Sequence, residues 1–326
     1  MAETVSEQAV ITPELNGERL DAAAARLFPA YSRSRLQAWI KSGALRLDGE
    51  SCRPRDKVRA GATLALEAEL EAEVTWQPEA IALDIVYEDD SILVLNKPAG
   101  LVVHPAAGHA DGTLVNALLN HVPAMENLPR GGIVHRLDKE TSGLMVAAKS
   151  LPAHHSLVAQ LQARSVKRQY CAICVGAMTG GGTIDEPIGR HPRQRKKMAV
   201  VAVGGKPAVT HYRIAQRFGH HTRVAVNLET GRTHQIRVHM AHRKYPLVGD
   251  PVYGGRPRIP KGASSDLIEA LRGFPRQALH AEALGLVHPL TGEAMQFECP
   301  LPADIAALLA VLASEDPVDA GAASPY

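Results

Sequence analysis

Residues 131–144 read GGIVHRLDKETSGL, and this stretch constrains the fold more than any other part of the chain. Its apolar residues 133–137 predict a strand, the Thr, Ser and Gly that follow predict a turn, and residues 144–148 predict a second strand. Asp138 would then lie at a strand end, beside a turn that contains a flexible glycine. On spacing alone this carboxylate either caps the turn or has a chemical function, and capping is the commoner role.

The segments around this stretch predict an α+β domain. The predicted elements follow one another without regular alternation of strand and helix, which argues against a doubly wound parallel sheet. Strands are expected at 85–87, 92–95, 170–175, 211–214 and 223–228, and helices at 113–121 and 153–163.

The N-terminal part of the chain has a different pattern. Apolar residues at helical spacing predict one helix over 17–28, ended by Pro29, and a second helix from Ser32 to Lys41. A short strand at 45–47, a tight turn at 48–49 and a closing strand at 64–66 follow. Two helices and a small hairpin, with basic residues along the second helix, resemble the S4 RNA-binding module over about sixty residues.

Charge is strongly segregated along a chain of 326 residues whose net charge is only +2. Residues 31–59 carry a net charge of +5, and residues 190–223 hold nine Lys or Arg and no acid. Residues 67–90, by contrast, hold nine acids and no Lys or Arg. A charge run is often only a solvated face, but two separate basic zones favour a polyanion partner. The composition otherwise excludes a membrane protein and a disulfide scaffold, and we expect a soluble, cytoplasmic protein with reduced cysteines.

Motifs for cofactors and metals are missing from the sequence. It contains no phosphate-binding Gly-x-x-x-x-Gly-Lys-Ser/Thr loop and no dinucleotide-binding Gly-x-Gly-x-x-Gly. No His-Glu-x-x-His occurs, and Cys171 and Cys174 have no partner pair that would complete a zinc site. These absences argue against a nucleotide-binding site and against a metal enzyme.

Five ordered motifs resemble those of the RluA-type pseudouridine synthases. His135 to Gly143 is similar to the catalytic motif of that family, and the N-terminal module with residues 189–198 is most similar to its ribosomal large-subunit synthase D branch. The resemblance covers about residues 14–312. The other four motifs are 96–105, 167–170, 230–239 and 249–254.

The resemblance implies a fold and a division of the chain. The catalytic domain should have a mixed, mainly antiparallel central sheet, preceded by a small S4-like RNA-binding domain. We expect a flexible segment at 1–13, the S4-like domain at 14–75, a linker at 76–80, the catalytic domain at 81–312 and an acidic disordered tail at 313–326.

The same resemblance implies conversion of uridine to pseudouridine without a cofactor, and it assigns roles to residues. Asp138 is the catalytic carboxylate, either as nucleophile or as the base that starts elimination, and Arg237 pairs with it. Tyr170 completes the catalytic set. Substrate binding falls to Arg136, which enters the space vacated by the flipped base, with Ile236, Lys97 and His135, the last mainly as scaffold.

Binding of the RNA backbone falls to the two basic zones, through Arg33, Arg35, Lys41, Arg193, Arg195, Lys196 and Lys197. The implied substrate is large-subunit (23S) ribosomal RNA, free or in an assembling particle, with uridines in the helix 69 stem-loop, and nothing requires more than a monomer. Two alternatives remain open. One is a non-catalytic S4-type RNA-binding or ribosome-assembly factor, and the other is a glycosidase-like hydrolase that would need a second catalytic acid.

Overall fold

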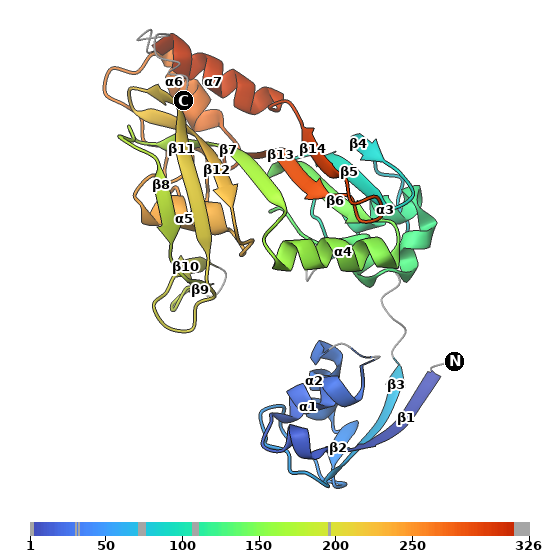
Figure 1. The fold of residues 1–326 in the computed structure, drawn as a ribbon. Helices are drawn as coiled ribbons and strands as arrows, with labels where there is room; N and C mark the ends of the chain where they lie inside the picture. Colours follow the sequence, from blue (N-terminus) through green and yellow to red (C-terminus); the bar gives the residue numbers. More distant parts are fainter. Residues whose placement is uncertain are drawn as a thin grey trace. The chain divides into compact units, whose positions relative to one another are not determined.

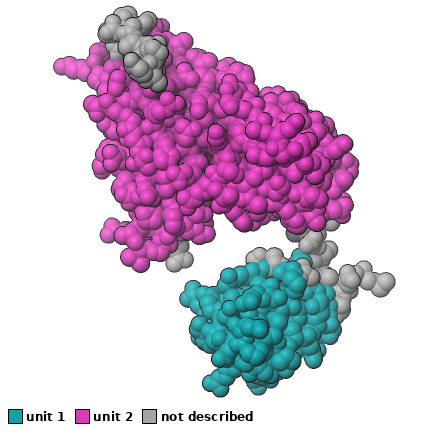
Figure 2. All heavy atoms as spheres, in the orientation of Figure 1, with its two compact units in different colours: residues 1–75 teal, residues 76–326 magenta. Residues whose placement is uncertain are grey.

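The computed structural model describes residues 3–29, 31, 33–70, 76–105, 111–194 and 197–315. The chain divides into two compact units, residues 1–75 and residues 76–326, drawn in teal and magenta in Figure 2. Each unit has its own hydrophobic core and is described by itself. No helix within the described ranges is long and apolar enough to cross a membrane.

Unit 1 packs two helices on a three-stranded sheet of order β1-β3-β2. The helices pack through the fully buried side chains of Leu20, Leu36 and Ile40, which recur at helical spacing as the sequence predicts. The elements are β1 (Glu3–Val10), a short 3-10 turn (Pro13–Leu15), α1 (Leu20–Leu27), α2 (Arg33–Ser42), β2 (Leu45–Leu47) and β3 (Thr63–Leu70).

Two predicted boundaries are wrong. Residues 1–13 were expected to be flexible, yet β1 pairs antiparallel with β3 along its whole length, from Glu3 opposite Leu70 to Val10 opposite Thr63. The pairing is non-local, so the polar sequence of β1 gave no local sign of it. Residues 76–80 were expected to be a linker, but the Glu79 amide donates to the Asn116 carbonyl at 3.0 Å, and Trp76 packs on the core of unit 2.

Unit 2 is an α+β domain around a mixed, mainly antiparallel sheet, as predicted (Figure 1). Among the described residues, nine strands form this sheet in the order β4-β5-β6-β13-β7-β12-β11-β8, with β14 paired to β13. Only β6 and β13 run parallel in the part described. The strands are β4 (Ile85–Glu88), β5 (Ile92–Lys97), β6 (Ser142–Ala148), β7 (Lys167–Val175), β8 (Gly182–Asp185), β11 (Val209–Phe218), β12 (His221–Leu228), β13 (Leu279–Val287) and β14 (Ala294–Glu298).

Helices and one further hairpin surround this sheet. The hairpin consists of β9 (Ile188–Arg190) and β10 (Met198–Val200), and it includes the first part of the second basic zone. The predicted acidic tail lies outside the described residues from 316 onward, while 313–315 end a helix. The helices are α3 (Leu114–His121), α4 (Leu151–Gln162), α5 (Gln235–His242), α6 (Ser265–Gly273) and α7 (Ala303–Glu315), with short 3-10 turns at Pro123–Asn127 and Pro129–Gly132.

The segment 133–137 is not the strand that its apolar residues predict. This segment runs beside β6 without regular strand pairing, and its one backbone bridge joins Ile133 to Ala147. The His135 ring supplies the next contact, because its Nε2 accepts a hydrogen bond from the Val146 amide at 3.1 Å. A side chain thus replaces a backbone carbonyl at the edge of β6, and the backbone that leads to Asp138 leaves the sheet.

Candidate active site

A cavity of about 810 Å³ opens where the loop before β6 meets α5 and β7. This volume lies in the range of small-molecule sites, roughly 300–1,000 Å³. Six of the seven residues assigned to catalysis or substrate binding line it, although they come from three separate segments. They are His135, Arg136 and Asp138 before β6, Tyr170 on β7, and Ile236 and Arg237 on α5.

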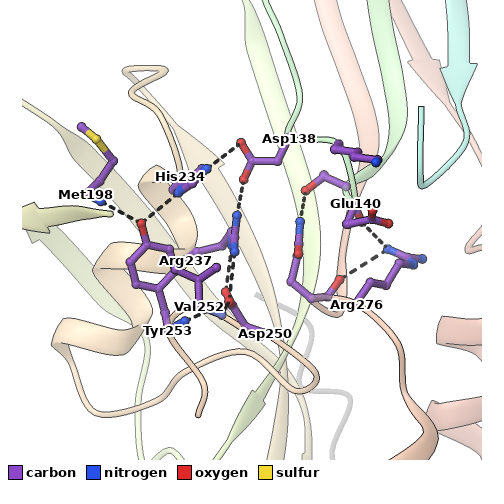
Figure 3. A network of polar contacts seen from close by, with 12 residues as sticks. Asp138, Glu140, Met198, His234, Arg237, Asp250, Val252, Tyr253 and Arg276 are labelled. Carbon is purple, nitrogen blue, oxygen red and sulfur yellow. Dashed lines mark hydrogen bonds and ion pairs between the residues drawn. The ribbon is translucent and has the colours of Figure 1, made fainter. Parts of the chain in front are cut away.

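Asp138 and Arg237 form the predicted salt bridge across 99 positions of sequence (Figure 3). Arg237 Nη1 donates to Asp138 Oδ2 at 2.9 Å. The guanidinium is only 5% exposed, and it also binds Asp250 through Nε at 2.8 Å and Nη2 at 3.0 Å. Three of its five N–H donors therefore bind two carboxylates, which fixes the position of the guanidinium.

Asp250 was not predicted as a site residue, although it lies in one of the quoted motifs. The backbone amides of Val252 and Tyr253 donate to its Oδ1 at 2.8 and 3.0 Å. Burial alone would raise the pKa of Asp250, but the hydrogen bonds and charge of Arg237 outweigh it and hold the pKa below its usual range. Asp250 is thus a buried anion that orients Arg237 toward the cavity.

The loop that carries Asp138 is held from behind by residues that no sequence motif indicated. Arg276 Nη1 donates to the Glu140 carbonyl at 3.1 Å, and its Nε and Nη2 bind Asp304 at 2.7 and 2.9 Å. Gln277 donates to the Thr141 hydroxyl at 3.1 Å. Because Arg276 and Gln277 come 136 positions later than their partners, no local pattern could connect them.

Gly143 shows why this loop needs a glycine. Its φ is +114°, and a Cβ there would lie 2.3 Å from the Ala281 carbonyl oxygen of β13. The backbones of β6 and β13 therefore approach more closely than any side chain allows. This contact fixes where the loop that carries Asp138 enters the sheet.

Lys97 does not reach the cavity, so its assignment to substrate binding is wrong. It is fully buried, and its Nζ donates to the carbonyls of Pro98, Leu101 and Lys139 at 2.7, 2.9 and 3.0 Å. Burial lowers the pKa of Lys97 to about 7, against an opposing attraction from Glu140. The amine ties the end of β5 to the loop that carries Asp138.

Tyr170 and Ile236 form an apolar part of the cavity wall and are 6% and 4% exposed. Burial raises the pKa of Tyr170, so its hydroxyl stays protonated at neutral pH. Burial also lowers the pKa of His135 to about 3, which agrees with a neutral ring that accepts from the Val146 amide. Arg136, next in the chain, is exposed at the cavity.

His234 is a further cavity residue that received no role from the sequence. It begins α5 in the left-handed region, with φ of +57°, which is uncommon for a residue other than glycine. Its Nδ1 lies 2.8 Å from the Tyr253 hydroxyl, and its Nε2 lies 3.8 Å from Asp138 Oδ1. Burial lowers the pKa of His234, so a neutral ring faces the open oxygen of Asp138.

The expected RNA-binding residues fall into different environments. Arg33 binds the buried Asp21, Arg35 lies over the Trp39 ring at 5.9 Å, and Lys41 is exposed. In the second basic zone Arg193 is exposed, whereas Lys197 donates to the Val252 carbonyl at 2.9 Å. Arg195 and Lys196 lie outside the described residues. Within the described part of the chain, no group of three or more His, Cys, Asp or Glu could hold a metal ion.

Comparison with known proteins agrees with this arrangement. The family model described as RNA pseudouridylate synthase matches residues 91–242, and the S4 domain model matches residues 18–64. Solved structures with this fold include human RNA pseudouridylate synthase domain containing 4 and domain containing 1. Their TM-scores are 0.56 and 0.52 at 28% and 26% identity, over 70% and 73% of this chain and 92% and 98% of theirs.

Relatives match over nearly the whole length. "Ribosomal large subunit pseudouridine synthase D" of Pseudomonas aeruginosa is 63% identical over 312 residues, 96% of this chain and 97% of the relative. The protein of the same name from Escherichia coli (strain K12) is 54% identical over 316 residues, 97% of both chains. The chain belongs to the RNA pseudouridylate synthase family, and within it these high-identity relatives are ribosomal large subunit pseudouridine synthases D. This family consists of enzymes, which decides against a non-catalytic binding factor.

Proposed function

We propose that the protein isomerises specific uridines to pseudouridine in large-subunit (23S) ribosomal RNA, in the helix 69 stem-loop, with Asp138 and without a cofactor. The observation that carries this proposal is the Asp138 carboxylate itself, held in the cavity by Arg237 at 2.9 Å with its second oxygen open. The names of the relatives at 63% and 54% identity support the ribosomal substrate.

The sugar chemistry falls to Asp138. Isomerisation breaks the C1′–N1 bond, turns the uracil and joins C5 to C1′, while C5 loses a proton and N1 gains one. A charged carboxylate beside the ribose starts this sequence, either by attack on C1′ or by removal of a sugar proton. The hydrogen bond from Arg237 Nη1 holds one oxygen of Asp138 and orients the carboxylate in the cavity.

The base is held by the apolar wall and released from the RNA by Arg136. Tyr170 packs against the flipped uracil, and Ile236 closes the other side. Base flipping costs a few kcal/mol unless something fills the gap, and the exposed guanidinium of Arg136 is the group at the cavity that fills it. His135 positions Arg136 through its bond to the Val146 amide.

Affinity for RNA comes from the two basic zones. Arg33, Arg35 and Lys41 serve in the S4 unit, and Arg193, Arg195, Lys196 and Lys197 serve in the second basic zone. Such phosphate contacts position the RNA without reading its sequence. The partner is free ribosomal RNA or an assembling particle. The protein acts on it in the cytoplasm as a monomer.

Mapping of pseudouridines tests this proposal. The purified protein is incubated, without metal or nucleotide, with a large-subunit RNA transcript that contains helix 69. Carbodiimide labelling and reverse-transcription stops then locate the product, with Asp138→Asn beside the wild type. New stops in that loop, absent with the variant, are expected. Stops that appear only when ribosomal particles replace the free transcript would show that the particle is the substrate. Stops outside helix 69 would show that the enzyme modifies other uridines.

A further inference from the structure

Arg168 is a buried arginine in the cavity wall with no described carboxylate to neutralise it. Its side chain is 8% exposed and lines the cavity beside Tyr170. Glu229 also lines the cavity, but its carboxylate binds Arg164 and His211 and not Arg168. A buried charge without a counter-ion is costly. Such a charge points to an anionic partner that arrives with the substrate.

The hydrogen bonds of Arg168 leave part of its donor capacity unused. Its Nη2 donates to the carbonyls of Leu228 and Glu229 at 3.5 and 3.3 Å, both at the long end of the range. Its Nε is buried and has no acceptor. An arginine has five N–H donors, and a buried donor without a partner costs free energy.

Gly231 shapes the wall around this guanidinium. A Cβ at position 231 would lie 2.8 Å from Arg168 Nη1, so a side chain there would displace the guanidinium. The glycine therefore leaves room for the Arg168 guanidinium beside the backbone at position 231.

Arg168 also faces the place of the base. It precedes Tyr170 by two positions on β7, and residues i and i+2 of a strand point to the same face. Burial raises the pKa of the Tyr170 hydroxyl, and the charge of Arg168 opposes that rise. A uracil packed on Tyr170 would thus lie within the field of this cation.

We propose that Arg168 stabilises the uracil anion that forms when the C1′–N1 bond breaks, an inference that rests on the proposed function. The electron pair of that bond leaves with uracil, whichever way Asp138 starts the reaction. The negative charge spreads over N1, O2 and O4, and the N–H groups of Arg168 Nη1, which make no hydrogen bond within the described residues, donate to these atoms. When C5 bonds to C1′, C5 loses its proton and N1 takes one up, so the guanidinium is unchanged.

Single-turnover kinetics of the full chain on a helix 69 transcript test this role. Removal of one donor to a developing anion typically lowers the rate by about 10²–10³-fold. Arg168→Met should therefore lower the rate about 10²-fold, with unchanged RNA affinity and salt dependence, and Arg168→Lys should lose less. Arg272→Met, an exposed arginine on α6, is the matched control. A rate within threefold of wild type for Arg168→Met would overturn the proposal.

Two further measurements distinguish anion stabilisation from a structural role and from a phosphate contact. With 5-fluorouridine at the target, fluorine stabilises the uracil anion, so the cleavage defect of Arg168→Met should shrink severalfold. A purely structural role would leave the ratio of rates unchanged and overturn the proposal. A weaker RNA affinity, together with a slope of log affinity against log salt that corresponds to one phosphate contact fewer, would identify a phosphate partner instead.

Gly231→Ala should reproduce part of the defect if Arg168→Met fails to fold. A wild type that forms no pseudouridine would overturn the proposed function and this inference together.

Discussion

Two aspartates, one in each unit, bind arginine side chains in opposite ways. In unit 1 the side chain of Asp21 is fully buried and accepts hydrogen bonds from Arg19, Arg33 and Gln37 at 2.6 to 3.3 Å. In unit 2 the side chain of Asp138 is 19% exposed and accepts one, from Arg237. No hydrogen bond from a described residue reaches the second oxygen of Asp138, and His234 Nε2 lies 3.8 Å from it.

The difference separates a structural carboxylate from one available for chemistry. Both oxygens of Asp21 accept hydrogen bonds within unit 1, so this carboxylate fixes the positions of its partners. Asp138 is oriented just as firmly, because its one arginine is itself held by Asp250. The restraint acts on the arginine and leaves one carboxylate oxygen open to a ligand in the cavity.

Replacement of the open carboxylate should have the largest effect. Asp138→Asn keeps the shape of the side chain but removes the charge, and loss of such a group lowers turnover by about 10⁴-fold or more. RNA affinity and thermal stability should stay near those of the wild type. Single-turnover assays and RNA titrations check this. Asp266→Asn, an exposed aspartate on α6, is the matched control, and turnover that survives in Asp138→Asn would move the catalytic carboxylate elsewhere.

Release of the restraint on Arg237 should have the next largest effect. Asp250→Asn leaves the guanidinium with a single carboxylate, so Arg237 and Asp138 lose their fixed geometry. A misplacement of about 1 Å can cost about 10²-fold in rate, and we expect a loss of this size in kcat. Asp266→Asn, on α6, serves as the control. An unchanged kcat would mean that Asp138 alone orients Arg237.

Asp21→Asn should destabilise unit 1 while turnover at saturating RNA stays within about twofold of wild type. Removal of one partner from a buried hydrogen-bonded network costs about 1–3 kcal/mol. Affinity for RNA should fall as well, because Arg19 and Arg33 lose the carboxylate that positions them. Urea unfolding followed by Trp39 fluorescence, in a Trp76→Phe background, measures the first effect. Equal stability of the two proteins would show that Asp21 is dispensable.

The pH dependence of unit 1 should reveal the same carboxylate. Burial would raise the pKa of Asp21, but the hydrogen bonds from Arg19, Gln37 and Arg33 lower it to about 2 from 3.8. Because the folded pKa is depressed, its contribution to stability is complete above pH 3.8 and is lost as pH falls through about 2. The wild type should therefore lose more stability than Asp21→Asn between pH 5 and roughly pH 2.5. Parallel stability profiles would contradict this.

Lys41→Ala should have the smallest effect. Lys41 is exposed on α2, and the described residues offer it no carboxylate. Its loss should lower the slope of log affinity against log salt by about 0.7–0.9, with no change in stability. Arg33→Ala, on the same helix, should change both quantities because Arg33 also binds Asp21. An identical result for the two variants would remove the distinction between them.

Local patterns predicted much of this molecule. The helices of unit 1, and β7, β12 and α4 beside the cavity, follow from the sequence patterns, whereas α5 was not predicted. The motif resemblance brought Asp138, Tyr170 and Arg237 together. The wrong predictions share a cause. The pairing of β1, the path of 133–137 and the position of Lys97 each depend on contacts between distant segments.

The sequence by itself determined the family, the order of its motifs and the set of chemical groups, because each is written within a few neighbouring residues. Only the tertiary structure decided which of these groups meet and which oxygens stay open. Asp250 binds and orients Arg237, and Asp21 binds Arg33. Asp304 binds Arg276, which in turn holds the loop that carries Asp138. A carboxylate and an arginine look alike in a sequence wherever they occur. Burial and the number of partners, which arise only from packing, give them different functions.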